Sequence, residues 1–129
     1  MDTALNSALL VLILLQGKHM FADYFLQTPR MLAGRSTYVH LGRTEHAALH
    51  AILSFLVLKI CGATLLFSVI ICVVEWVAHY HIDWVKGCYS QRKKHGPTDA
   101  AYWRAFGLDQ LMHQLTYVAM IWAFVRYGI

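Results

Sequence analysis

EWVAHYHID, at residues 75–83, closes a long apolar run that begins near Leu65. A helix places residues four apart on one face, so this stretch carries one polar stripe on an otherwise apolar helix: Glu75, His79 and Asp83. The same four-residue spacing of potential metal ligands recurs three times, at His19/Asp23, His46/His50 and Asp109/His113. The sequence therefore predicts four helical segments, each with a pair of metal-ligand side chains on one face.

The composition is typical of an integral membrane protein. Of the 129 residues, 58% are hydrophobic and only 14% are charged, and the mean hydropathy is +0.46. A soluble domain has about 25% charged residues, and one of this size could not bury so much apolar surface. The net charge of +4 then marks cytoplasmic loops, and nucleic acid is not expected as a partner. The widely spaced Cys61, Cys72 and Cys88 argue against a disulfide framework or a thiolate metal site.

The order of apolar segments and breakers predicts an all-α, four-helix integral membrane bundle that forms one domain over residues 1–129. We expect helices at about 4–27, 44–60, 64–88 and 102–127, with long loops at 28–43 and 89–101. Pro29 ends the first helix, because the residue before a proline is pushed out of the α region. Thr44 is a good N-cap for the second helix, and Gly96-Pro97 breaks the second long loop.

Basic residues cluster at one end of this bundle. Only Lys59 and Arg126 lie at the opposite end. Because cytoplasmic loops carry the excess of Lys and Arg, we expect both long loops in the cytoplasm and both termini on the non-cytoplasmic side. The basic residues in or near the two long loops are Lys18, Arg30, Arg35, Arg43, Lys86, Arg92, Lys93, Lys94 and Arg104.

The paired polar side chains are predicted to meet in one layer. At 1.5 Å per residue they lie roughly 6–16 Å inside the loop-side helix ends, and charged groups in a membrane normally face the interior of a bundle. Imidazole with carboxylate suits zinc, manganese or iron, and we expect a divalent transition metal, zinc before the others. A purely structural polar core and a proton or substrate relay remain alternatives, and the role of His46 is left open. The predicted ligands are His19, Asp23, His50, His79, Asp83, Asp109 and His113.

Three stretches resemble the DUF3307 family of small bacterial and phage membrane proteins: residues 21–27 (FADYFLQ), His79 with Ile82-Asp83 and Lys86, and Asp109-Gln110 with His113. The resemblance covers nearly the whole chain. It implies a multi-pass protein of the bacterial inner membrane and carries no assigned activity. A looser similarity links the chain to membrane-bound metal-dependent hydrolases of the YdjM kind. Their pattern of a basic residue followed by Thr-His is interrupted here by an inserted glutamate, in Arg43-Thr44-Glu45-His46.

The first functional hypothesis is a metal-dependent hydrolase that acts at the cytoplasmic interface on a lipid-linked or phosphorylated substrate. The metal would activate a water, Glu75, Asp83 or Asp109 would accept its proton, and Arg43 and Lys86 would steer the anion. A carrier for metal ions or protons is the second hypothesis, and a non-catalytic membrane interaction module with a structural polar core is the third. The expected partners are the lipid bilayer and an anionic or lipid-linked substrate, and self-association into a homo-oligomer is left open.

Overall fold

The structure is a computed structural model that describes residues 3–129, and these residues form α-helices without any strand. The all-α prediction is confirmed. The helices are α1 (Thr3–Tyr24), α2 (Pro29–Ala33), α3 (Leu41–Ile60), α4 (Leu65–Lys93) and α5 (Ala100–Tyr127).

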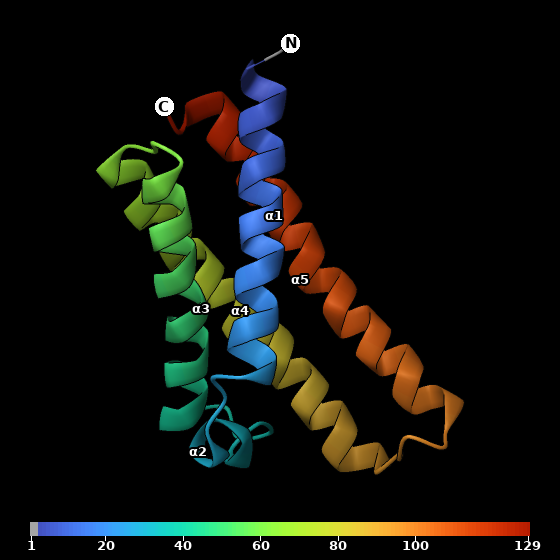
Figure 1. The fold of residues 1–129 in the computed structure, drawn as a ribbon. Coiled ribbons are helices and arrows are strands. Elements are labelled where there is room, and N and C mark those ends of the chain that lie inside the picture. The colour runs from blue at the N-terminus through green and yellow to red at the C-terminus, as the bar shows by residue number, and fades with distance from the viewer. Residues whose placement is uncertain (1–2) are drawn as a thin grey trace.

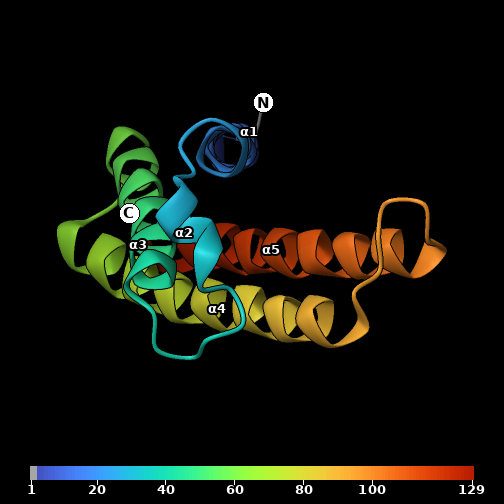
Figure 2. The same cartoon turned by 90° about the horizontal axis from the view of Figure 1, so that it is seen from below.

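The four long helices contact one another in a ring. α1 packs against α3 and α5, and α4 packs against α3 and α5. Neighbours in the ring run in opposite directions, so the two chain ends lie at one end of the molecule and the two long connections at the other (Figure 1). Seen from the loop end, α4 and α5 extend well beyond α1 and α3 (Figure 2).

The 28–43 segment, expected as a loop, contains the short helix α2. Helix α1 ends at Tyr24, three residues before its predicted end. Thr28 then caps α2, because its Oγ1 accepts a hydrogen bond from the backbone N–H of Met31, and Pro29 occupies the first helical position. Proline is favoured there, since its missing N–H would have no helical partner anyway. The Thr-Pro pair therefore separates two helices instead of only ending one.

Two other helix ends differ from the prediction by three residues or more. Helix α3 begins at Leu41, before the expected cap at Thr44, because the His40 Nδ1 accepts a hydrogen bond from the Gly42 N–H. Helix α4 continues to Lys93 and ends where Lys94 adopts a left-handed conformation, with φ of 54°.

Residues 29–36 lie against α3 and α4 through two glycines. A Cβ added to Gly42 would lie 2.0 Å from the Arg30 carbonyl oxygen, and one added to Gly87 would lie 2.3 Å from the Arg35 carbonyl oxygen. Both contacts are with backbone, which cannot rotate away as a flexible side chain can. The two glycines therefore allow the α2 segment to cover the loop end of the helices.

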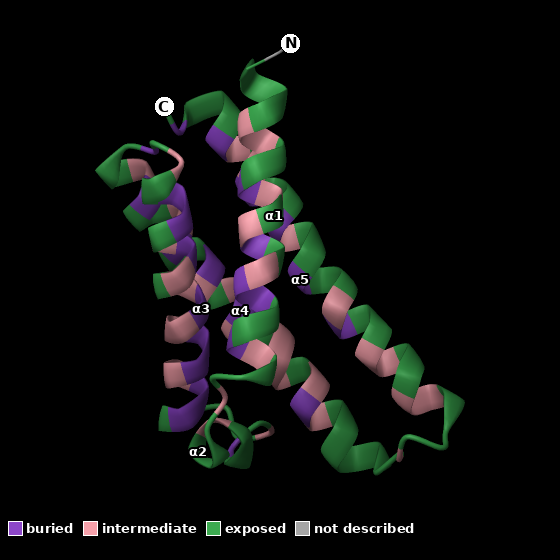
Figure 3. Ribbon diagram, viewed as in Figure 1, coloured by how far each residue is buried: buried purple, intermediate pink, exposed green. Residues whose placement is uncertain are grey.

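The apolar core occupies the end of the molecule that carries the termini. Leu15, Leu58, Tyr117 and Phe124 are at most 2% exposed and form its centre. Exposed residues occur along all four long helices (Figure 3), and many of them are large hydrophobic residues.

By length and composition, two of the described helices could cross a membrane, namely α1 and α4. In each candidate span only 22% of the residues are buried. A core helix of a soluble protein would bury far more of its surface, so this exposure favours contact with lipid.

Candidate metal centre

A layer of histidine and aspartate side chains lies on the loop side of the apolar core, with contributions from α1, α3, α4 and α5. Three groups have ligand atoms that all lie within 4.8 Å of one another, and each could hold a metal ion. The groups are His19/Asp23/His50, His46/His50/His79 and His79/Asp83/His113.

Asp23 is the carboxylate of the first half of this layer. Its Oδ1 lies 3.0 Å from His50 Nε2 and 3.4 Å from His46 Nε2, and its Oδ2 lies 3.2 Å from His19 Nε2. The four-residue spacing within α1 brings His19 and Asp23 to the same face, and the contact between α1 and α3 brings in the two α3 histidines.

Asp83 is the corresponding carboxylate of the second half of the histidine–aspartate layer. Its Oδ2 lies 3.1 Å from His79 Nε2 and 3.4 Å from His46 Nε2, and its Oδ1 lies 3.2 Å from His113 Nε2. The two halves repeat one pattern, since α1 and α4 each supply a His-x₃-Asp pair and the helix beside each supplies histidine.

His46 connects the two halves and was not assigned a role from the sequence. Its Nε2 is 3.4 Å from a carboxylate oxygen of both Asp23 and Asp83. Its ring centroid lies 4.8 Å from that of His50 and 5.1 Å from that of His79. The His46/His50 spacing was the available signal. The predicted helix start at Thr44 placed His46 at the helix end, whereas the observed start at Leu41 places it almost one turn deeper.

The spacing of these donors fits a shared metal ion. Ligands about 2.0–2.1 Å from a tetrahedral zinc lie about 3.3–3.4 Å from one another. The nitrogen–oxygen distances around Asp23 and Asp83 are 3.0–3.4 Å. Each of these nitrogen–oxygen pairs is therefore spaced as two ligands of one zinc ion would be, and all ligand atoms of each group lie within 4.8 Å of one another.

Unpartnered buried atoms point to the same conclusion. Within residues 3–129, His79 Nε2 and Asp109 Oδ1 are buried and have no hydrogen-bond partner. His79 Nε2 is 3.1 Å from Asp83 Oδ2, but the direction of this contact is not that of a hydrogen bond. Buried polar atoms are normally paired, so an unpaired His79 Nε2 beside a carboxylate is compatible with a metal ligand.

Neighbouring polar groups orient the rings. His19 Nδ1 lies 2.9 Å from the hydroxyl of Tyr117, which is 2% exposed, and its Nε2 lies 3.1 Å from Gln110 Oε1. Groups that hold the second nitrogen of a ligand histidine fix its ring orientation and tautomer.

Asp109, predicted as a ligand, lies at the edge of the layer and belongs to none of the three groups. Its Oδ1 is 3.6 Å from His113 Nε2. Its Oδ2 accepts hydrogen bonds from Lys86 Nζ at 3.0 Å and from Gln110 Nε2 at 3.1 Å. This carboxylate is therefore held by Lys86 and Gln110, beside the histidine cluster.

Glu75 was predicted as a catalytic carboxylate, and the structure places it behind the histidines. It is 1% exposed and pairs with Lys18, whose Nζ lies 2.6 Å from Glu75 Oε1. Lys18 Nζ also lies 3.3 Å from His50 Nδ1 and donates to the His50 carbonyl at 3.2 Å. Lys18 was counted among the loop-side basic residues and is instead buried. The Lys18–Glu75 pair thus contacts His50 through Lys18, and neither residue lines the cavity described below.

Arg43 was predicted to bind substrate, and its observed contacts are structural. Its guanidinium donates to the carbonyls of Thr37, Tyr38 and Tyr80 and lies 3.9 Å from the centre of the Tyr80 ring. Only 3% of the residue is exposed. These contacts fasten the 37–38 segment to α4 and leave the guanidinium outside the cavity.

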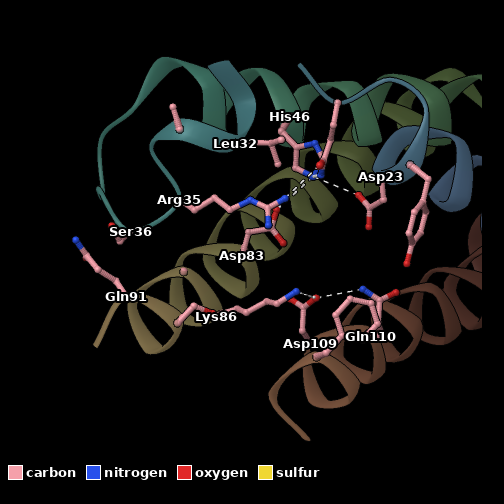
Figure 4. A pocket seen from close by; sticks show the side chains of 16 residues that line it. Asp23, Leu32, Arg35, Ser36, His46, Asp83, Lys86, Gln91, Asp109 and Gln110 are labelled. Atoms are coloured by element: carbon pink, nitrogen blue, oxygen red, sulfur yellow. Dashed lines mark hydrogen bonds and ion pairs between the residues drawn. The ribbon is translucent and has the colours of Figure 1, made fainter. Parts of the chain in front are cut away.

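A cavity of about 370 Å³ opens over this layer. Asp23, His46, Asp83 and Asp109 line it from the helices, and Arg35 and Lys86 extend into it from the α2 segment and from α4 (Figure 4). Lys86, which was predicted to steer an anionic substrate, thus lines the cavity. Arg35 occupies the position expected for Arg43, and no spacing in the sequence singled it out. The cavity joins carboxylate and imidazole donors to two cationic side chains.

A family model described as "Protein of unknown function (DUF3307)" matches residues 9–128. No curated protein and no solved structure matches the chain. The likeness to hydrolases of the YdjM kind is not shown by these comparisons, so a hydrolase activity remains a proposal. The family match includes every residue of the site, from His19 to His113. The chain therefore belongs to the DUF3307 family.

Proposed function

We propose that this protein is a membrane-embedded metal-dependent hydrolase that cleaves a phosphate ester at the loop-side membrane interface. The observation that carries the proposal is the cavity in which Asp23, His46 and Asp83 face Arg35 and Lys86. Carboxylate and imidazole donors suit transition metals such as zinc, and Arg and Lys suit a phosphate group.

The membrane placement rests on the exposed apolar faces. We propose that α3 and α5 cross the bilayer together with α1 and α4, because Ile52, Leu56, Leu111 and Leu115 are 46–59% exposed on their outer sides. We propose that the loop end faces the cytoplasm of a bacterial inner membrane, because the basic residues cluster at that end and cytoplasmic loops carry the excess of Lys and Arg. The cavity then opens at the cytoplasmic interface.

In this proposal the chain's own residues divide the work of hydrolysis. A bound metal would polarise the phosphate and activate a water. Arg35 and Lys86 hold the phosphate oxygens, and Asp109 takes the proton from the attacking water. Asp109 lines the cavity, and its Oδ1 accepts no hydrogen bond from residues 3–129. The new bond joins the water oxygen to phosphorus, the ester bond breaks, and the leaving alcohol receives the proton from Asp109.

The apolar core supports a hydrolase over a carrier. A carrier needs polar groups that continue across the membrane, whereas the residues beyond the histidine layer, among them Leu15, Leu58 and Phe124, are buried and apolar. The site is therefore open on one side and closed on the other, as a hydrolase requires.

The test is phosphate release from p-nitrophenyl phosphate and from phosphatidic acid by the purified protein, after loading with zinc or manganese. Asp109→Asn should lower the rate about 10²–10⁴-fold, as removal of a general base does. Asp99→Asn, at an exposed carboxylate in the 94–99 connection, should leave the rate unchanged. Equal rates in both variants, or no metal-dependent release from either substrate, would reject the proposal.

A further inference from the structure

A second cavity, of about 580 Å³, lies between the loop-side halves of α4 and α5. Its size falls within the roughly 300–1,000 Å³ of typical ligand pockets. Its walls are mostly apolar, with basic side chains, Lys86 and Arg104, among the lining residues. We call it the α4–α5 groove, and its apolar walls comprise Ile82, Val85, Ala101, Ala105, Leu108 and Met112.

The groove exists because α4 and α5 are longer than their neighbours. They extend past the loop ends of α1 and α3 (Figure 2), so neither of those helices covers their outer portions. Val85 is 61% exposed, Leu108 is 64% exposed and Met112 is 48% exposed. Contiguous apolar surface of this kind marks a binding site for apolar partners.

The groove and the polar cavity share one wall. Lys86 and Asp109 line both, and their side chains pair at 3.0 Å between them. An amphiphilic molecule could therefore place its charged group beside Lys86 in the polar cavity and its apolar part along Leu108 and Met112. A soluble phosphate ester would use the polar cavity alone and would leave the groove without a role.

We propose that the α4–α5 groove seats the hydrocarbon chain of an anionic lipid whose phosphate headgroup enters the metal-lined cavity past Lys86. The inference rests on the proposed function and narrows its substrate class to lipid phosphates. Charge favours this occupant, because Arg35 and Lys86 line the cavity that would receive the headgroup and bind a phosphate in preference to a neutral headgroup. In this proposal the lipid reaches the groove directly from the bilayer, since the lining residues Val85, Leu108 and Met112 are exposed.

The experiment measures binding and does not depend on hydrolysis. The full chain in phosphatidylcholine nanodiscs is exposed to phosphatidic acid with a diazirine in its acyl chain, and the photolabelled residues are mapped by mass spectrometry. Labels should concentrate in residues 82–89 and 101–112. Unlabelled phosphatidic acid should compete for these sites, whereas glycerol phosphate and the bulk phosphatidylcholine should not.

Ala105→Trp fills the groove, and Ala119→Trp adds the same bulk to an exposed position on the same helix outside it. Ala105→Trp should lower groove labelling about tenfold, the loss expected when two methylene groups stay outside, and Ala119→Trp should not. Leu108→Glu is a second variant, which puts a negative charge at an exposed position in the groove wall and should cause the same loss of labelling.

The proposal is overturned if all exposed apolar faces are labelled equally, or if labelling is unchanged in both groove variants. Either result would mean that the groove contacts lipid only as any other apolar surface does. A dimer that dissociates in Ala105→Trp without loss of labelling would assign the groove to a second copy of the chain. If the groove labels but no phosphate is released, only the hydrolase proposal fails. If p-nitrophenyl phosphate is hydrolysed but the groove is not labelled, only the proposal that the groove binds a lipid hydrocarbon chain fails.

Discussion

Removing one partner of the Lys18–Glu75 ion pair should destabilise the protein far more than removing a surface ion pair. Both side chains are buried, at 6% and 1% exposure, and their charged atoms are 2.6 Å apart. Lys18 pairs with Glu75 Oε1, and Glu75 Oε2 has no hydrogen-bond partner among residues 3–129. Lys18→Met therefore leaves a carboxylate in the interior without a counter-ion. Breaking a buried pair in this way costs about 3–5 kcal/mol.

The assay is thermal unfolding in detergent, with chelator present so that metal binding does not contribute. At roughly 3–5 °C per kcal/mol for a chain of this size, Lys18→Met should lower Tm by about 9–25 °C. Glu75→Gln should also destabilise, and the double variant should lose less than either single change, because it buries no unpaired charge.

The control is Arg30→Met, which breaks an ion pair with Glu45 whose arginine side chain is 62% exposed. Surface pairs contribute about 0–1 kcal/mol, so its Tm should hardly change. If Lys18→Met and Arg30→Met shift Tm equally, or if the two buried changes are additive, the pair does not stabilise the interior as argued.

Two further predictions concern the loop end. Gly87→Ala places a methyl group against the Arg35 carbonyl oxygen and should raise hydrogen exchange in residues 34–38. Gly107→Ala, with open space around its Cβ, should not. Equal exchange in the two variants would show that the contact at Gly87 does not hold this segment against α4. A cysteine placed at Ser36 or Ser90, in a background without native cysteines, should react only with a reagent on the cytoplasmic side, and labelling from outside would reverse the proposed orientation.

The helices and their polar faces could be predicted from the sequence because both depend on local spacing. Residues four apart share a face in any helix, so the pairs His19/Asp23 and His79/Asp83 were found without knowledge of the packing. The structure brings both pairs into one layer, at 3.1–3.2 Å within each pair.

The rotation of each helix against its neighbours could not be predicted in this way. Lys18 precedes His19 by one residue and therefore faces about 100° away from it. α1 packs against both α3 and α5, so both directions are interior: Lys18 reaches His50 and Glu75, and His19 reaches Tyr117. Arg43 was misplaced for the same reason, since depth along a helix does not say which side chains face the cavity.

The most direct test of the metal centre is the metal content of the purified protein, measured after saturation with zinc and removal of the excess. Each of the two carboxylates contacts two histidines that the other does not, and both share His46, so we predict two ions per chain. His19→Ala affects only the Asp23 half and should leave one ion, and His113→Ala affects only the Asp83 half and should also leave one. His95→Ala, in the 94–99 connection, should keep both.

Retained metal should also raise Tm, since an ion that binds the folded state stabilises it by mass action. A folded wild-type protein that retains no zinc, manganese or iron would contradict the account. Equal metal content in the His19, His113 and His95 variants would contradict it as well, and the histidine layer would then be a structural polar core.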